Sequence, residues 1–435
     1  MLKKIKHNIH NHFPFLDGKK ILIAISGGLD SVVLAHLFSE LNFDISLAHC
    51  NFQLRGKESN LDEAFVLKLS QQKLLPIFIK KFDTEEFAKN KKLSIQVGAR
   101  QLRYNWFKEL TNEHHFDYVL TAHHADDNLE TFLINFTRGT GLDGFTGIPA
   151  VNGNIIRPLL TFSRAEILAF AKENTIEWRE DISNSSTKYI RNKIRHQVIP
   201  ILKEINPSLL DSFSNTTKNL QESKQIIEDK VSEITSKIVS KENNITKFDI
   251  EKLKRLSNPK AYLYQILKSY NFTEWNDIYD VLSAQSGKQI FSKTHRLLKD
   301  RDFLVLSKKT PSKTNKKFFI EQDQSEIHEP ISLSIEKVTT ITTVNKQTIY
   351  VDADLLTFPL TLRKWQNGDF FYPTGMTGKK KISKFFKDKK LSLLEKENIW
   401  LLCSLGNEII WVLHQRNDRR FLATESTNTI LKISI

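Results

Sequence analysis

Strand-like and helix-like segments alternate through residues 1–205 of this 435-residue chain. The four segments that read as buried strands are Lys20–Ile25, Ile45–Cys50, Pro76–Phe82 and Asp117–Ala122. Between them, Ser31–Leu41 and Leu61–Leu69 carry apolar residues at helical spacing, and Ser163–Glu166 has the spacing of a capping box that opens another helix. Strands that alternate with helices favour a parallel sheet covered on both faces. We therefore expect an α/β domain with a doubly wound, Rossmann-like parallel sheet over residues 1–205.

The rest of the chain has a different character. Residues 209–239 are polar, helical in period and free of Gly and Pro, which predicts a small, mostly helical second domain over 206–317. We expect this domain to end in a short hairpin within 289–309 and a basic linker, Lys308–Lys317. Residues 318–435 are rich in Ile, Thr and Val that alternate with polar residues, so a small α+β domain is predicted there.

The loop Ser26–Ser31, with the sequence SGGLDS, directly follows the first strand. Two glycines let backbone N–H groups approach an anion, and the helix that follows points its positive end at the same place. The loop has neither the Walker A nor the GxGxxG pattern. Asp30 would repel a phosphate unless a cation such as Mg²⁺ lies between them. The alternative is that Asp30 and Ser31 only cap the helix; we favour a phosphate site.

Charge and composition limit the partners and the location of the protein. The net charge is +14, from 64 Lys and Arg against 50 Asp and Glu, which favours a polyanionic partner such as RNA or DNA. A lysine-rich coding bias would also explain it. Cys50 and Cys403 are too few for a disulfide framework, and no apolar run approaches the ~20 residues of a membrane span. We expect a cytoplasmic protein that does not enter a membrane.

The stretch His123–Glu130, HHADDNLE, follows the fourth strand and concentrates acids and imidazoles. One interpretation is the metal cluster of a hydrolase, but only His49 offers a further ligand on another strand end. The interpretation we favour is a pocket whose acids hold the ammonium group of an amine substrate.

Two more stretches carry side chains suited to anions. Ala48–Val66 leaves the second strand at the edge where open α/β sheets bind ligands, so its polar residues could flank a nucleotide. The ordinary polarity of a surface loop explains these residues about as well. Arg100 and Arg103 lie three residues apart on an expected helix, on one face suited to phosphate or carboxylate. A solvated helix face is the alternative there.

These motifs together resemble a known family. SGGLDS resembles the SGGxDS signature of the PP-loop ATP pyrophosphatases, which split ATP into AMP and pyrophosphate to adenylate a substrate. The tRNA(Ile)-lysidine synthetases of this superfamily carry HxNHxLRGxxSxxDExFV, SxQxxARxxRYxxF, AHHxxDxxETxLxxxxRGtG, EDxSNxxxxYxRNxIRxxxxP and a C-terminal GDxFxPxGxxGxKKxxxFFxDxK block. Similar stretches stand here at Ala48–Val66, Ser94–Phe107, Thr121–Gly141, Glu180–Pro200 and Leu362–Lys390. The sequence departs from the commoner form at Phe52, where a second His is usual, so no role is assigned to that position.

The resemblance implies a ligase that uses ATP and Mg²⁺ to join free L-lysine to the 2-carbon of the wobble cytidine of tRNA(Ile) with a CAU anticodon. An adenylated cytidine would be the intermediate, and AMP and pyrophosphate the by-products. It leaves open whether the chain forms a homodimer. The domains then become a PP-loop catalytic domain over 1–205, a tRNA-recognition domain over 206–317 and a tRNA-binding domain over 318–435.

The resemblance also assigns residues. The ATP site would comprise Ser26, Gly27, Gly28, Asp30, Ser31, His49 and Asn51, with Asp30 also holding Mg²⁺. The lysine and cytidine pocket would comprise His123, Asp127 and Glu130, and the catalytic set would be Asp30, Arg103, His123, Asp127 and Glu130. The side chains expected to contact tRNA or phosphate are Arg100, Arg191, Arg195, Lys379, Lys380, Lys381 and Lys384. Seven lysines lie between Lys379 and Lys390, where Phe385 and Phe386 would either stack on bases or belong to the core.

Two competing functions remain at this stage. A PP-loop tRNA thiolase needs a sulfur-carrying cysteine or an iron–sulfur site, and Cys50 has no partner cysteine near it in sequence. A non-catalytic RNA-binding protein with a dead nucleotide pocket would have no chemical reason to keep Asp30 and Asp127.

Overall fold

The computed structural model describes residues 1–180, 190–242, 245–309, 316–342 and 345–435. The chain divides into two compact units, Met1–Asp229 and Lys230–Ile435. Most of the expected linker and the first part of the Glu180–Pro200 motif lie outside the described residues. No helix in the part of the chain that the structure describes is long and apolar enough to cross a membrane.

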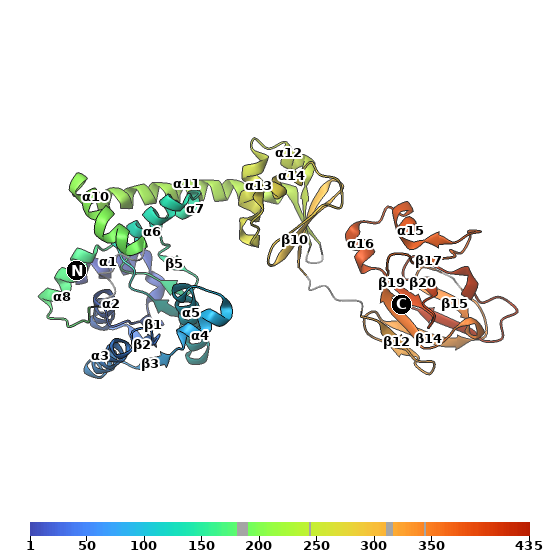
Figure 1. Ribbon diagram of the computed structural model, residues 1–435, viewed down its shortest axis with the longest axis horizontal. Coiled ribbons are helices and arrows are strands. Elements are labelled where there is room, and N and C mark those ends of the chain that lie inside the picture. The colour runs from blue at the N-terminus through green and yellow to red at the C-terminus, as the bar shows by residue number, and fades with distance from the viewer. Residues whose placement is uncertain (181–189, 243–244, 310–315, 343–344) are drawn as a thin grey trace. The chain divides into compact units, whose positions relative to one another are not determined.

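The first unit is built on a six-stranded sheet (Figure 1). In spatial order its strands are β3 (Ile77–Lys81), β2 (Asp44–Asn51), β1 (Lys20–Ala24), β4 (Tyr118–Leu120), β6 (Ile155–Ile156) and β5 (Val151–Asn152). Only β5 is antiparallel to its neighbour. The predicted doubly wound parallel sheet is therefore confirmed, and the four expected strands agree with β1 to β4 within two residues at each end.

Helices cover both faces of this sheet, because the apolar strand residues alternate between two cores. The helices whose residues join Ile21, Ile23, Ile45 and Leu47 in one core are α1 (Leu2–His12), α2 (Leu29–Glu40), α3 (Lys57–Lys73) and α8 (Arg164–Glu173). On the other face α5 (Ile95–His114), beside α4 (Thr84–Lys91), packs Trp106, Phe107 and Leu110 against Leu22 and Ala48. Figure 1 shows α4 and α5 on the opposite side of the sheet from α2 and α3.

Helix starts follow the capping chemistry of the sequence. The expected capping box at Ser163–Glu166 is present and begins α8, and the Ser94 hydroxyl caps α5. A third small core joins Leu129, Ile134, Ile194, Ile199 and Phe213. These residues come from α6 (Ala125–Arg138), η3 (Ile194–Val198), α10 (Ile199–Ile205) and α11 (Leu209–Ile238). The short helices α7 (Leu142–Phe145) and α9 (Ile190–Lys193) lie close to them in the sequence.

The second unit starts with a five-stranded antiparallel sheet and short helices. The sheet order is β7 (Val239–Glu242), β8 (Ile245–Asp249), β11 (Phe303–Lys308), β10 (His295–Asp300) and β9 (Gln289–Phe291). The helices are α12 (Ile250–Lys254), α13 (Pro259–Leu267), η4 (Lys268–Tyr270) and α14 (Trp275–Asp280). The sequence predicted the helices and the hairpin β10–β11. It did not predict the other three strands of the sheet that contains this hairpin. Its strands β7 to β9 are only three to five residues long, too short to show a clear alternation.

The C-terminal segment forms two antiparallel sheets around a shared core. One has the order β12 (Phe318–Ile320), β16 (Leu360–Lys364), β19 (Trp400–Cys403), β20 (Ile409–Val412) and β21 (Arg416–Asn417); the other has β13 (Glu326–Ile327), β14 (Leu333–Val338), β22 (Ile430–Ser434) and β15 (Thr348–Asp352). The hairpin β17 (Phe370–Phe371) with β18 (Lys380–Lys381) and the helices α15 (Ile382–Asp388) and α16 (Leu393–Asn398) complete it. This segment has the α+β character that the sequence predicts.

Candidate active site

The strand order of the first unit reverses between β1 and β4, which lie side by side. Segment Ser26–Ser31 leaves the carboxyl end of β1, and segment Thr121–His124 leaves the carboxyl end of β4. In open α/β sheets such a reversal leaves a crevice where ligands bind. The topology therefore brings the glycine loop and the histidine-acid segment, about ninety residues apart in sequence, to the same crevice.

Hydrogen bonds hold the glycine loop in a tight turn. Ser31 Oγ accepts from the backbone N–H of Ser26 at 3.1 Å and donates to the Gly28 carbonyl at 2.9 Å. Gly27 has φ +90°, a conformation that L side chains rarely adopt, and Gly28 is the N-cap of α2. The loop thus directs the positive end of α2 toward the crevice, as an anion site requires.

Arg179, which the sequence analysis did not single out, ties this loop to α3. Its backbone N–H donates to the Gly27 carbonyl at 2.9 Å. Its guanidinium bonds Asp62 at 2.6 Å and Glu58 at 2.7 Å. No local sequence signal could have revealed this contact, because the partners lie more than one hundred residues apart.

A cavity of about 250 Å³ lies at the crevice. The predicted site residues that line it are Ser26, Asp30, Ser31, Arg103, His123, Asp127 and Arg191. Ala48, Cys50 and Phe52, from β2 and the residue after it, line it as well. The side chains of His49, Asn51, Glu130, Arg100 and Arg195 are not among the lining groups.

Asp30 has the environment of a group that waits for a cation. Among the described residues its Oδ1 atom is buried without a hydrogen-bond partner. Burial raises its pKa, and Asp127 nearby adds to the rise while His124 opposes it. A carboxylate oxygen without a partner beside a phosphate-type loop fits Mg²⁺, which prefers one or two carboxylates together with phosphate oxygens. Within the described ranges no group of three His, Cys, Asp or Glu side chains is arranged to hold a metal, so phosphate would have to complete the set.

His123 is neutral in this site. Burial lowers its pKa to about 4, Asp127 opposes the shift, and the charges of Arg157, Arg191 and Arg100 add to it. The ring Nδ1 lies 3.0 Å from the hydroxyl of Thr121. With so low a pKa, His123 can accept a hydrogen bond at neutral pH but is a weak acceptor for a full proton.

Asp127 and Glu130 are joined by Arg195. The guanidinium of Arg195 donates to both oxygens of Glu130, at 2.5 and 2.9 Å, and to Asp127 at 3.3 Å. Glu130 is fully buried, and burial raises its pKa although Arg195 opposes the rise. Arg195 was expected to face tRNA or phosphate; in the structure it neutralises Glu130 and leaves Asp127 at the cavity wall. The long-range pairing of α6 with η3 was not visible in sequence.

Two other arginines face the cavity. Arg103 lies on α5 with its guanidinium 5.2 Å from the centre of the Phe52 ring. Arg191 lies on α9 and bonds the Thr131 hydroxyl at 2.7 Å, with Glu130 at 3.5 Å. Arg100 lies on the same helix as Arg103, as expected, with its guanidinium 4.7 Å from the Tyr104 ring.

His49 and Asn51 point away from the cavity because side chains alternate along β2. His49 Nδ1 lies 3.0 Å from the Ile25 carbonyl, and its side chain is 4% exposed. Asn51 donates to Glu63 at 2.7 Å on α3. Their even-numbered neighbours, Ala48 and Cys50, face the cavity instead. The predicted contacts of His49 and Asn51 with ATP therefore have no support from this geometry.

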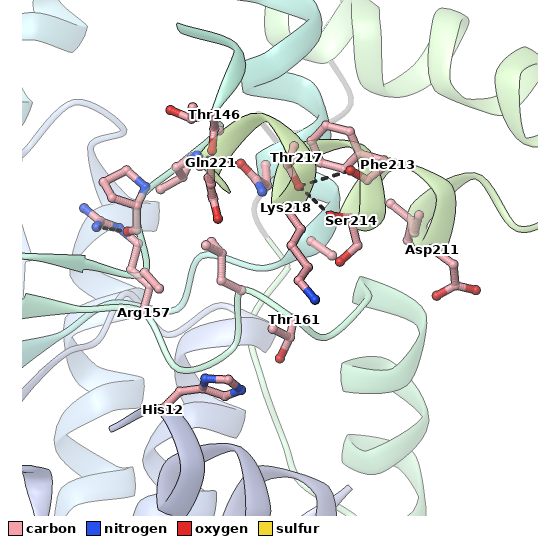
Figure 2. Close-up of a pocket in the computed structure, with 18 of the residues that line it drawn as sticks. His12, Thr146, Arg157, Thr161, Asp211, Phe213, Ser214, Thr217, Lys218 and Gln221 are labelled. Atoms are coloured by element: carbon pink, nitrogen blue, oxygen red, sulfur yellow. Dashed lines mark hydrogen bonds between the residues drawn. The ribbon is translucent and has the colours of Figure 1, made fainter. Parts of the chain in front are cut away.

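A larger cavity of about 1130 Å³ lies on the other side of the segment that follows β4 (Figure 2). Ala125 and Asn128 line it, whereas His123 and Asp127 line the smaller one. Figure 2 shows Thr217, Lys218 and Gln221 of α11 across from Thr161 and His12. Arg157 also borders it, and Figure 2 shows its bond to a carbonyl oxygen, which belongs to Pro149 at 2.6 Å.

The lysines expected to contact RNA lie in the second unit. Lys379, Lys381 and Lys384 are exposed, whereas Lys380 is half-buried and bonded to Asp388 at 2.6 Å. Phe385 and Phe386 are 2% and 0% exposed and belong to the local core, so they do not form a stacking platform.

Three protein-domain families match the chain. The PP-loop domain matches residues 1–202, the TilS substrate binding domain matches 241–309, and the TilS substrate C-terminal domain matches 360–434. The first match lies in the first unit, and the other two lie in the second.

Full-length relatives agree with these matches. The tRNA(Ile)-lysidine synthase of Parabacteroides distasonis is 40% identical over 442 residues, which cover 100% of this chain and 99% of that protein. Its counterpart in Bacteroides thetaiotaomicron is 37% identical over 432 residues, 99% of this chain and 98% of that protein. The counterpart in Porphyromonas gingivalis is 34% identical over 450 residues, 99% and 97% of the two chains. The chain belongs to the tRNA(Ile)-lysidine synthase family.

Proposed function

We propose that this protein is a ligase that joins free L-lysine to the 2-carbon of the wobble cytidine in tRNA(Ile) with a CAU anticodon. The observation that carries the proposal is one cavity lined by Ser26, Asp30 and Ser31 of the glycine loop, by Asp127 and by two arginines. Membership of the family supplies the substrate class, and the cavity supplies the groups that its chemistry needs.

The first half of the reaction makes the cytosine oxygen into a leaving group. The 2-oxygen of cytosine attacks the α-phosphate of ATP, an O–P bond forms, and pyrophosphate leaves. The loop Ser26–Ser31 would hold the β- and γ-phosphates through backbone N–H groups and the N-terminus of α2. Arg103 and Arg191 face the same cavity and would stabilise charge on the α-phosphate. Asp30 would hold Mg²⁺, which neutralises charge on the departing pyrophosphate.

The second half uses the amine of lysine as nucleophile. The amine has an ordinary pKa near ~10.4, so it must lose a proton before it attacks the activated carbon and expels AMP. Asp127 is the acidic side chain at the cavity wall beside His123. We assign to Asp127 the binding of the ammonium group and the acceptance of its proton, and to neutral His123 a hydrogen bond to it. Glu130 and Arg195 hold Asp127 in place from inside the protein.

The decisive experiment measures lysine transfer. The protein is incubated with ATP, radiolabelled lysine and either tRNA(Ile) or tRNA(Met), both with a CAU anticodon. We expect label in tRNA(Ile), one AMP per lysine, and little label in tRNA(Met). Asp127→Asn should still release pyrophosphate but fail to transfer lysine. No label in tRNA(Ile) with the wild-type protein would refute the proposal and would favour a non-catalytic RNA-binding protein.

The thiolase alternative is less well supported by the structure. Cys50 lines the cavity, but burial raises its pKa to about 12, so its thiolate is scarce at neutral pH. The other cysteine, Cys403, is buried in the second unit. Location in the cytoplasm and the oligomeric state stay predictions.

A further inference from the structure

The second histidine of the His123–Glu130 segment has no role in the mechanism above, although it lies beside two of the acids that line the cavity. His124 is 2% exposed and lies among three carboxylates. Its Nε2 is 3.7 Å from Asp30 Oδ2 and 3.4 Å from Asp127 Oδ2, and its Nδ1 is 3.7 Å from Asp126 Oδ2. Asp30 and Asp127 serve different halves of the proposed reaction, so one imidazole contacts the groups of both.

The two ring nitrogens of His124 have different tasks. Nδ1 accepts the backbone N–H of Asp127 at 3.4 Å, while the Asp127 carboxylate accepts the backbone N–H of His124 at 3.2 Å. This reciprocal pair is the capping box that begins α6. Because Nδ1 accepts, a ring that carries a single proton carries it on Nε2, the nitrogen that lies 3.4 Å from Asp127 Oδ2 and 3.7 Å from Asp30 Oδ2.

The surrounding charges explain why such a group is needed. Asp30 and Asp127 are like charges in one half-buried site, and repulsion between them would displace one carboxylate. Asp126 is already satisfied by Lys203 at 2.8 Å and by the backbone N–H of Arg164 at 2.8 Å. Arg195 is committed to Glu130 and to the other oxygen of Asp127. The Nε2 atom of His124 lies near both carboxylates, 3.7 Å from Asp30 Oδ2 and 3.4 Å from Asp127 Oδ2.

We infer that His124 is a positioning residue that holds Asp30 toward the phosphate loop and Asp127 toward the cavity through its Nε2–H, while its Nδ1 caps α6. The inference rests on the proposed function, because it assigns Asp30 and Asp127 to the two successive steps. Loss of the Nε2–H should let Asp30 move and weaken the site for Mg²⁺ and ATP. It should leave the fold of α6 intact as long as the cap is kept.

Two substitutions separate the two nitrogens. In His124→Asn the amide oxygen takes the place of Nδ1, so the cap is kept and the contact with Asp30 is lost. In His124→Gln the amide nitrogen takes the place of Nε2, so the donor is kept and the cap is lost. Ser163→Ala is the matched control, because it removes the capping box of α8 without any contact with Asp30.

The test measures three quantities with full-length protein. They are the melting temperature without ligands, the Mg²⁺ concentration that half-saturates ATP binding in calorimetry without tRNA, and the rate of tRNA-dependent pyrophosphate release without lysine. We expect His124→Asn to keep the wild-type melting temperature, to need about 10- to 100-fold more Mg²⁺, and to release pyrophosphate more slowly by a similar factor, as is usual for residues behind a metal ligand. His124→Gln should melt lower yet need less Mg²⁺ than His124→Asn. Ser163→Ala should melt lower with wild-type Mg²⁺ dependence.

The outcomes distinguish this inference from the proposed function. If wild-type protein releases no pyrophosphate in the presence of tRNA and ATP, the proposed function fails. If wild-type protein is active and His124→Asn has unchanged Mg²⁺ dependence and rate, the positioning role is refuted. It is also refuted if His124→Gln needs more Mg²⁺ than His124→Asn, because the effect would then follow the cap.

Discussion

Replacing Asp30 by Asn should make the ligand-free protein more stable while it impairs catalysis. The Oδ1 atom of Asp30 is buried without a hydrogen-bond partner among the described residues, and burial raises the pKa of the carboxyl group. An unsatisfied buried polar group costs about 1–3 kcal/mol, and more when it is charged. The amide keeps two polar atoms, so we expect the lower end, about 1 kcal/mol. For a unit of this size that corresponds to a rise of about 2–4 °C in melting temperature.

The stability gained by Asp30→Asn depends on pH, because the pKa of Asp30 differs between the folded and the unfolded protein. The folded-state pKa of Asp30 lies above its ordinary value, so the folded protein holds the proton more tightly than the unfolded chain. Wild-type stability therefore falls as pH rises through the raised pKa. The Asn variant has no such loss, so its advantage should grow as pH rises through the raised pKa of Asp30 and should shrink in acid.

Differential scanning calorimetry with and without Mg²⁺ and ATP provides the assay. In wild-type protein, ligand saturating at 100 times its Kd should stabilise the ATP-binding unit by about 2.7 kcal/mol, which identifies its transition. In Asp30→Asn that ligand shift should shrink while the ligand-free transition rises. Asp126→Asn is the matched control and should melt lower, because Asp126 accepts hydrogen bonds from Arg164 and Lys203. A ligand-free Asp30→Asn protein that melts below wild type at neutral pH would refute the reasoning.

Three further predictions follow from the same geometry. Cys50→Ala should retain lysine transfer, and iodoacetamide should label Cys50 slowly, because burial raises its pKa to about 12; loss of transfer would reopen the thiolase alternative. The single-turnover rate of lysine transfer should show no inflection from His123 between about pH 5 and 8, because burial lowers the pKa of His123 to about 4 and its ring stays neutral there. An inflection near pH 6.5 that disappears in His123→Gln would contradict this. Lys379→Ala and Lys384→Ala should each weaken tRNA binding and reduce the slope of log affinity against log salt by about 0.7–0.9. Lys380→Ala should change the slope less, because Lys380 is bonded to Asp388; equal slopes for all three variants would refute the distinction.

Local patterns in the sequence were sufficient for much of the first unit. Ile21, Leu22 and Ile23 within Lys20–Ala24 are buried on both faces, as in strands of a covered parallel sheet. The SGGLDS loop follows them with the glycine conformation that a tight turn needs. The capping box at Ser163 required only two residues three positions apart. Such features depend on neighbours in sequence, so a single chain reveals them.

The sequence alone determined the parallel α/β domain and the phosphate-type loop. It also determined those cavity residues that directly follow strands, such as Asp30, His123 and Asp127. Tertiary structure alone decided how those groups are used. It paired Arg195 with Glu130, placed Arg179 against the glycine loop, pointed His49 and Asn51 to the far face of β2, and set His124 near both Asp30 and Asp127. The physical reason is that charge pairing and burial join residues far apart in the chain, and spacing along the sequence carries no record of those distances.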